Sequence, residues 1–300
     1  MNSTPAKVDS ACPVCGHNGA VLVSTEDRYG DSLRTLACAQ CGLYRNDPLP
    51  TVAQLKAYHE VEYRKSYKGR REPKAKNVYR SRRLAGQRLA ALRRWLPAAG
   101  AVLDAGSGSG EFLAALKGAG LSPQGLEADA VYADYARRQY QVPVMDAGLL
   151  EAEFPAGAFG AITLFHVLEH QPDPIAVLER LGQWLAPGGV LVVEVPNLDS
   201  LNQHPAKRFH FAHVLGFTPA SLALAAQRAG YAIQASSEAN FGRDLQIILR
   251  QQAGPAPVLD TPRPLVTSGQ TILAYYLRPQ TYLRFLLRMK QFLGEYLATR

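Results

Sequence analysis

A glycine-rich turn between an expected strand and an expected helix constrains the fold of this chain most strongly. Residues 104–110 read DAGSGSG, after the apolar pair Val102 and Leu103 and before a helical pattern. Such a turn lets a ligand approach backbone N–H groups at the N-terminus of a helix. The third glycine of the dinucleotide pattern G-x-G-x-x-G is missing, because Phe112 stands near that position. The turn alone therefore indicates only a nucleotide-like ligand.

The residues after this turn alternate between short apolar strands and helices. We predict strands at 101–105, 124–127, 143–146, 161–165 and 190–195, and helices at 110–119, 130–139, 174–185 and 219–229. This alternation is typical of an α/β fold with a mostly parallel sheet that helices cover on both faces. Two later strands, at 231–236 and 245–250, are separated only by a loop and are expected to pair antiparallel.

A second acid and three motifs narrow the ligand. Glu127 ends the strand at 124–127, where a carboxylate can accept both hydroxyls of a ribose. Residues 104–110 resemble motif I of class I S-adenosylmethionine-dependent methyltransferases. Residues 165–174 (FHVLEHQPDP) resemble the segment after strand four in the subgroup with ubiquinone-biosynthesis and sugar methyltransferases, and residues 184–191 (WLAPGGVL) resemble the signature before strand five. The resemblance implies a Rossmann-like sheet of seven strands, mostly parallel with one antiparallel strand.

The same resemblance implies which residues contact S-adenosylmethionine. The turn would hold the methionine part, Glu127 the ribose, and the residues after the third strand the adenine. The cofactor-binding set is then Asp104, Gly106, Ser107, Gly108, Gly110, Glu127, Asp146, Ala147, Phe165, His166 and His170. For the two histidines a structural role is the alternative.

All four cysteines lie in the first 41 residues, as two C-x-x-C pairs that are each followed by glycine. Two intervening residues let one tight turn aim two thiolates at the same metal ion. We therefore predict a structural Zn²⁺ held by Cys12, Cys15, Cys38 and Cys41, on a ribbon with strands at 20–24 and 33–37. Unpaired thiols or a redox dithiol are the alternatives.

A cysteine module ahead of the methyltransferase domain resembles a branch that includes deoxysugar C-methyltransferases. Residues 46–51 with Tyr58 and Tyr63 fit the linker of that branch, and residues 194–197 followed by His210 and His213 fit its segment after strand five. Only 50 residues follow Arg250, so the large C-terminal domain of those enzymes is not expected, and their substrate does not transfer.

Methyl transfer requires an aligned acceptor and the removal of a proton from it. Histidine is the base best suited to neutral pH. His210 and His213 are the predicted catalytic bases, and Tyr63 is predicted to close over the acceptor or to share the proton transfer. Packing or substrate binding is the alternative for each of them.

Charge leaves two classes of acceptor open. The net charge is +8, and the stretch 64–94 holds many lysines and arginines against one acid, Glu72. Such a stretch contacts phosphate on a nucleic acid or on a small substrate, or is a solvated helix face.

We favour a small-molecule acceptor, such as a sugar, a nucleotide sugar or a secondary metabolite. A zinc-ribbon RNA methyltransferase is the alternative, and a non-catalytic S-adenosylmethionine-binding protein is less favoured. Residues 165–168 (FHVL) lack the Asn/Asp-Pro-Pro-aromatic motif of base amino-group methylation.

The expected organisation has five parts. Residues 1–48 form the zinc ribbon, 49–98 a helical lid, 99–253 the methyltransferase domain, 254–270 a linker and 271–300 a basic amphipathic helix. For that helix we favour packing or homodimerisation over a membrane surface. No apolar run approaches the ~18–20 residues of a membrane span, and no signal pattern begins the chain, so a cytoplasmic enzyme is expected.

Overall fold

The fold comes from a computed structural model, which describes residues 11–51, 53–55, 57–58, 72–201, 204–252, 275–279, 281–283, 285–286, 289 and 295–296. The prediction for Tyr63 and the first part of the basic stretch lie outside these residues. The chain divides into two compact units. One comprises Met1–Lys68, His166–Glu179 and Glu194–Thr281, and the other comprises Gly69–Phe165, Arg180–Val193 and Tyr282–Arg300.

A small sheet carries the cysteine turns in the first unit. Its strands are β1 (Ala20–Glu26), β2 (Ser32–Cys38), β3 (Tyr44–Asn46) and β9 (Leu215–Gly216), in that order across the sheet. The pairings β1–β2, β2–β3 and β3–β9 are antiparallel. Ala37 pairs with Tyr44, and both pack against Leu198. The predicted two-stranded ribbon is present, and it is extended by two more strands.

A second sheet has seven strands in the order β10-β11-β8-β7-β4-β5-β6. Strand β4 pairs in parallel with β5 and β7, β5 pairs in parallel with β6, and β10 and β11 are antiparallel. The predicted α/β fold with a mostly parallel sheet is confirmed. The strands are β4 (Ala101–Ala105), β5 (Ser122–Glu127), β6 (Val144–Asp146), β7 (Phe159–Phe165), β8 (Leu185–Pro196), β10 (Tyr231–Ala239) and β11 (Asp244–Gln251).

Local sequence signals explain where the helices begin. They are α2 (Ala75–Leu92), α3 (Glu111–Gly118), α4 (Ala130–Tyr140), α5 (Pro174–Trp184) and α6 (Pro219–Arg228). Asp129 caps α4 by accepting hydrogen bonds from Val131 N and Tyr132 N. Thr218 and Ser221 form a reciprocal capping box at the start of α6. Short polar side chains thus satisfy N–H groups that have no partner inside the helix.

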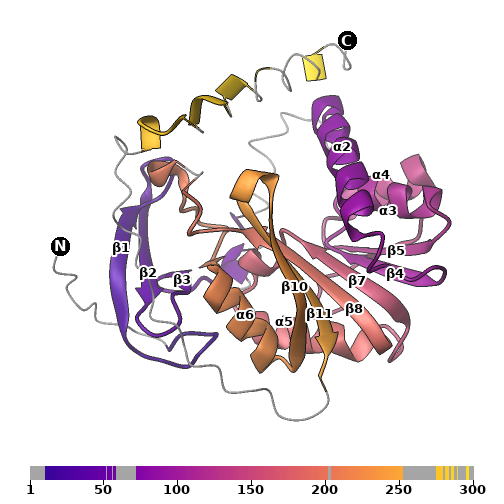
Figure 1. The fold of residues 1–300 in the computed structure, drawn as a ribbon, viewed down its shortest axis with the longest axis horizontal. Helices are drawn as coiled ribbons and strands as arrows, with labels where there is room; N and C mark the ends of the chain where they lie inside the picture. Colours follow the sequence, from indigo (N-terminus) through magenta and orange to yellow (C-terminus); the bar gives the residue numbers. More distant parts are fainter. Residues whose placement is uncertain are drawn as a thin grey trace. The chain divides into compact units, whose positions relative to one another are not determined.

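Helix α2 buries a narrow apolar face. Leu84, although apolar, is exposed. The buried residues of the helix are Val78, Ala85 and Leu92, which are seven residues apart. Helix α2 packs against α3 in the same unit (Figure 1). None of the helices formed by the described residues has both the length and the apolar character needed to cross a bilayer.

Candidate functional site

The glycine turn lies between the end of β4 and the start of α3. Gly106, Gly108 and Gly110 have φ angles of 79°, 52° and 90°, which residues with a Cβ adopt rarely. A Cβ on Gly110 would lie 2.6 Å from the Cβ of Ala136, so this glycine lets α4 pack against the turn. A Cβ on Gly108 would have no described atom within 4 Å. Gly110 is therefore required by packing, while Gly108 faces open space that a ligand could enter.

Glu127 is joined to this turn by its carboxylate. Gly108 N donates to Glu127 Oε2 at 2.7 Å, and Asp129 N donates to Oε1 at 2.9 Å. Burial raises the pKa of Glu127, although these hydrogen bonds oppose the shift. Each carboxylate oxygen has two lone pairs, so both can accept a further hydrogen bond. The side chain is thus held against the turn and retains acceptor capacity for two hydroxyls.

The end of β6 lies beside the end of β5. Asp146 is the register partner of Glu127, and Ala147 N donates to the Glu127 carbonyl oxygen at 3.3 Å. Asp146 is exposed and Ala147 is half-buried. The structure therefore brings these two predicted adenine-flanking residues to the same edge of the sheet as Glu127.

Asp104 is a buried acid near the end of β4. Thr163 Oγ1 donates to its Oδ1 at 2.6 Å. Burial raises the pKa of Asp104 to about 7, and the Thr163 hydrogen bond and the charge of Arg88 only partly offset this effect. The Arg88 guanidinium also lies 4.1 Å from the centroid of the Phe165 ring. The sequence did not single out Arg88 as a site residue, because Arg88 belongs to no recognisable motif and lies within a long basic stretch.

His166 directly follows β7 and lies among three carboxylates of its own unit. Its Nδ1 is 3.4 Å from Glu169 Oε1, and its Nε2 is 3.3 Å from Glu194 Oε1 and 3.9 Å from Asp244 Oδ2. Burial alone would lower the pKa of His166, but hydrogen bonds to Glu169 and Glu194 raise it to about 10. The ring is therefore an imidazolium at neutral pH and cannot accept a proton.

Three further histidines form a second group in the same unit, which we call the histidine cluster: His170, His210 and His213. The ring centroids of His170 and His213 are 4.8 Å apart, and those of His210 and His213 are 5.5 Å apart. Burial, followed by the charge of His170, lowers the pKa of His213 to about 3. His213 is consequently neutral across the physiological range.

Hydrogen bonds fix the roles of individual ring nitrogens in the other two histidines. His170 Nδ1 lies 2.8 Å from the Ala212 carbonyl oxygen, which only accepts, so Nδ1 carries a proton and donates this hydrogen bond. Ala212 N donates to His210 Nδ1 at 3.3 Å, so neutral His210 carries its proton on Nε2. That nitrogen lies 3.1 Å from the Tyr58 hydroxyl. His210 therefore donates to Tyr58, a contact that the sequence did not reveal.

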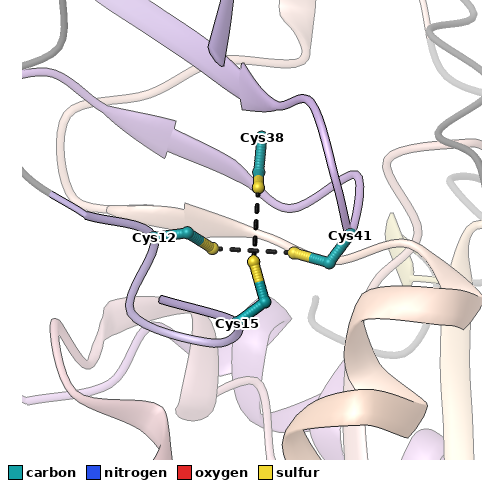
Figure 2. A group of neighbouring side chains, drawn as sticks. All are labelled: Cys12, Cys15, Cys38 and Cys41. Carbon is teal, nitrogen blue, oxygen red and sulfur yellow. Dashed lines mark hydrogen bonds between the residues drawn. The ribbon is translucent and has the colours of Figure 1, made fainter. Parts of the chain in front are cut away.

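The four cysteines meet at one point of the first unit. Figure 2 shows their sulfurs pointing towards one another, with Cys12 Sγ 3.6 Å from Cys41 Sγ and Cys15 Sγ 3.5 Å from Cys38 Sγ. Four sulfurs at ~2.3 Å from a tetrahedral Zn²⁺ would be about 3.8 Å apart. The donor set and the spacing both fit this ion. The side-chain hydrogen bonds of Cys12 and Cys41 lower the pKa of Cys38.

Two other groups of described side chains have potential ligand atoms close enough together to hold a cation. The potential ligand atoms of Glu169, His170 and His213 lie within 4.8 Å of one another, as do those of His166, Glu194 and Asp244. In the second group His166 is the cation, because its ring is protonated at neutral pH. The first group combines a buried carboxylate with the His170 and His213 rings.

Comparison with known proteins identifies the family. The family model described as a methyltransferase domain matches residues 77–236, which is more than half of the chain. The chain belongs to this methyltransferase family, and the resemblance to class I S-adenosylmethionine-dependent methyltransferases predicted from the sequence is confirmed.

Curated relatives include the ubiquinone biosynthesis O-methyltransferase of Xanthomonas campestris, which is 33% identical over 35% of this chain and 44% of its own length. The protein of the same name from Psychrobacter cryohalolentis is 35% identical over 38% of this chain and 45% of its own. The match thus spans less than half of the length of these relatives.

A solved structure with the same fold is the Burkholderia thailandensis 1,6-didemethyltoxoflavin-N1-methyltransferase with bound 1,6-didemethyltoxoflavin and S-adenosylhomocysteine. It has a TM-score of 0.53 and 23% identity, and the match covers 72% of this chain and 97% of that protein.

Proposed function

We propose that this chain transfers a methyl group from S-adenosylmethionine to a small-molecule acceptor. The observation that carries the proposal is the pairing of Gly108 with Glu127 beside open space, within a chain of the methyltransferase family. The turn 104–110 would hold the methionine part, Glu127 the ribose, and Asp146 with Ala147 the adenine. Phe165, His166 and His170 remain proposed cofactor contacts. The sulfonium supplies an activated methyl group, so the protein has to orient the acceptor, exclude water and remove a proton.

Within the proposed proton transfer, His213 is the base that we retain from the two predicted. Its ring is unprotonated at neutral pH, although the low pKa makes it a weak base, and the nearby negative charge of Glu169 favours the imidazolium that forms when the ring accepts a proton. His210 has both ring nitrogens engaged, one by Ala212 N and one by Tyr58, so we assign it the role of positioning Tyr58. Tyr63 stays a proposed acceptor contact.

A small-molecule acceptor is favoured over RNA by the positions of the basic residues in α2. Arg80 hydrogen-bonds to Glu295, and Arg82 lies 3.4 Å from the Tyr140 hydroxyl. Arg88 contacts the Phe165 ring. The Glu295 carboxylate neutralises Arg80, while neutral rings hold Arg82 and Arg88 in place, and both effects reduce contact with a phosphate backbone. The names of the relatives and of the structural neighbour also describe methylation of small molecules.

We also propose that the four cysteines hold one structural Zn²⁺. Cys12 and Cys15 lie on one turn, Cys38 and Cys41 on another, and Gly16 and Gly42 follow the turns with φ angles of 77° and 73°. The two turns have matching backbone hydrogen bonds, from Gly16 N to Cys12 O and from Gly42 N to Cys38 O. Four thiolates leave no position for a substrate, so the ion would stabilise the fold. Cysteines that hold a metal ion also fit a cytoplasmic location.

The test of the proposed acceptor class uses S-adenosylmethionine with a labelled methyl group. The purified chain is incubated separately with the small-molecule fraction and the RNA fraction of a cell extract, and the labelled product is identified by mass spectrometry. We expect label in the small-molecule fraction. Label found only in RNA would overturn the proposal, and cofactor binding without transfer to either fraction would support a non-catalytic protein.

A further inference from the structure

The hairpin turn of the cysteine ribbon lies beside the histidine cluster. This turn, residues 27–31, connects β1 to β2 and belongs to the same unit as the three rings. Arg28 N donates to the Phe209 carbonyl oxygen at 2.9 Å, next to His210 in the sequence. The Tyr29 ring meets the His210 ring edge-on, with the centroids 6.0 Å apart. The ribbon therefore contributes to the surroundings of the two histidines predicted as bases.

The turn is held in shape by its own first residue. Asp27 Oδ1 accepts hydrogen bonds from Tyr29 N at 2.7 Å and from Asp31 N at 3.0 Å. Gly30, with a φ angle of 87°, supplies the left-handed conformation that the turn requires. The Asp27 carboxylate thus closes the turn instead of pairing with the neighbouring Arg28.

Arg28 brings a positive charge to this place. Its guanidinium carbon lies 5.1 Å from the centroid of the Tyr29 ring. Its Nε is shielded from solvent and has no hydrogen-bond partner in the described part of the chain. Burial is the largest cause of the lowered pKa of His213, and the charge of Arg28 adds to it, so the guanidinium lies within electrostatic range of this ring. A shielded donor of a charged group costs free energy until a partner accepts its hydrogen bond.

The carboxylates near the histidines surround His166 instead of Arg28. Glu169 Oε1 is 3.4 Å from His166 Nδ1, and Glu194 Oε1 is 3.3 Å from His166 Nε2. The charge of the His166 imidazolium offsets part of their negative charge. Arg28 is therefore the cation of this region whose charge a ligand would neutralise.

We propose that Arg28 binds an anionic group of the methyl acceptor, a carboxylate or a phosphate, beside the histidine cluster. A guanidinium group presents parallel N–H donors that match the oxygens of both anions. Such a contact would fix one end of the acceptor close to His213, the ring that we propose as the base. The inference rests on the proposed methyl transfer and deepens it, because it names the charge of the acceptor and gives the ribbon a role in binding it.

Titration of the full chain with simple anions tests the site before the acceptor is known. Inorganic phosphate or acetate is added at constant ionic strength while the NMR signals of the histidine rings are followed, and His210→Gln and His213→Gln identify the signals of the cluster. We expect at least one anion to shift these signals with saturation, and the anion that binds more tightly indicates whether the acceptor carries a phosphate or a carboxylate. Arg28→Gln should weaken this binding at least about tenfold.

Two further variants complete the comparison. Arg28→Lys keeps the charge but not the parallel donors, so it should retain part of the affinity, and it keeps the test valid if Arg28→Gln folds poorly. Arg228→Gln is the matched control, because Arg228 is an exposed arginine at the end of α6 in the same unit. It should bind both anions like the wild type.

Three results would overturn the inference. The first is the absence of a saturable shift with either anion. The second is a shift that Arg28→Gln leaves unchanged or that Arg228→Gln weakens equally. The third is weaker binding of S-adenosylmethionine to Arg28→Gln, which would assign the guanidinium to the carboxylate of the cofactor.

Labelled methyl transfer separates this inference from the proposed function. The small-molecule fraction of a cell extract is divided by anion exchange, and we expect the labelled product among the retained, anionic molecules, with less label from Arg28→Gln. Label confined to the unretained molecules would overturn the inference and leave the methyl-transfer proposal intact. Transfer to neither fraction, with the anion-induced shifts present, would contradict the methyl-transfer proposal and leave an anion site at Arg28.

Discussion

The backbone N–H of Gly108 donates a 2.7 Å hydrogen bond to Oε2 of Glu127. This bond connects the turn after β4 to the acid that ends β5, so the two proposed contacts of the cofactor are fixed with respect to each other. Preorganisation of this kind lowers the cost of ordering the site on binding.

The first prediction follows from this bond. Glu127→Gln removes the charged acceptor that we assign to the ribose hydroxyls, and hydrogen bonds to charged groups contribute ~1.5–3 kcal/mol. We expect S-adenosylmethionine to bind about tenfold to a hundredfold more weakly, as measured by calorimetric titration. Glu153→Gln changes a carboxylate that is 88% exposed and should leave the affinity unaltered. Equal affinities in all three proteins would remove Glu127 from the site.

A second prediction tests the packing role of Gly110 in the glycine turn. Gly110→Ala places a Cβ at 2.6 Å from Ala136 Cβ and at a positive φ, so the free energy of unfolding should fall by ~1–3 kcal/mol. Gly118→Ala, at the end of α3, meets no described atom within 4 Å and has no positive φ. It should leave stability unchanged or slightly higher. Chemical denaturation compares the two variants with the wild type.

The sheet and the turn could be predicted because their signals are local. Each signal occupies a short stretch of sequence. This holds for the alternation of strands and helices, for the glycines of the turn and for the acid that ends β5. The partners of His166 could not be predicted in this way. Glu194 lies on β8 and Asp244 begins β11, so only the folded chain brings them to the ring. Arg88 is a similar case, because helix packing and not its neighbours places it near Asp104.

The third prediction concerns the pH dependence of stability. The pKa of His166 is raised from 6.5 to about 10 in the folded chain, so its stabilising effect is complete below pH 6.5 and is lost as the pH rises through about 10. His166→Gln leaves Glu169, Glu194 and Asp244 without their cation. We expect the variant to be less stable than the wild type at pH 6, with a difference that shrinks towards pH 10.

Urea unfolding at several pH values measures this difference. His204→Gln is the matched control, since that ring contacts the rings of Tyr275 and Tyr276 and not a carboxylate cluster. Its stability difference from the wild type should not depend on pH in this way. A constant difference for His166→Gln as well would contradict the assignment of His166 as a buried imidazolium.

The fourth prediction concerns the cysteines. Elemental analysis should find one zinc ion per chain, and Cys38→Ser should reduce this content and lower the melting temperature. Chelation of the wild type should produce a similar loss of stability, because a structural ion contributes folding free energy. Two results together would show that the four thiols do not form a metal site. The wild type would contain no zinc, and neither chelation nor Cys38→Ser would lower its melting temperature.

The fifth prediction distinguishes the two histidines first expected to act as bases. His213→Gln should lower kcat by about a hundredfold or more, the typical contribution of a general base, with little change in the affinity for S-adenosylmethionine. His210→Gln should reduce turnover less, because we assign that ring to positioning Tyr58. Tyr58→Phe should resemble His210→Gln. The opposite order of the two histidine variants would transfer the role of base to His210.

The most direct test of the central claim is a calorimetric titration of the wild-type chain with S-adenosylmethionine, followed by competition with S-adenosylhomocysteine. We predict saturable binding at one site per chain and displacement of the cofactor by its demethylated product. Absence of binding, or binding that S-adenosylhomocysteine does not displace, would contradict the assignment of the Gly108–Glu127 site to this cofactor.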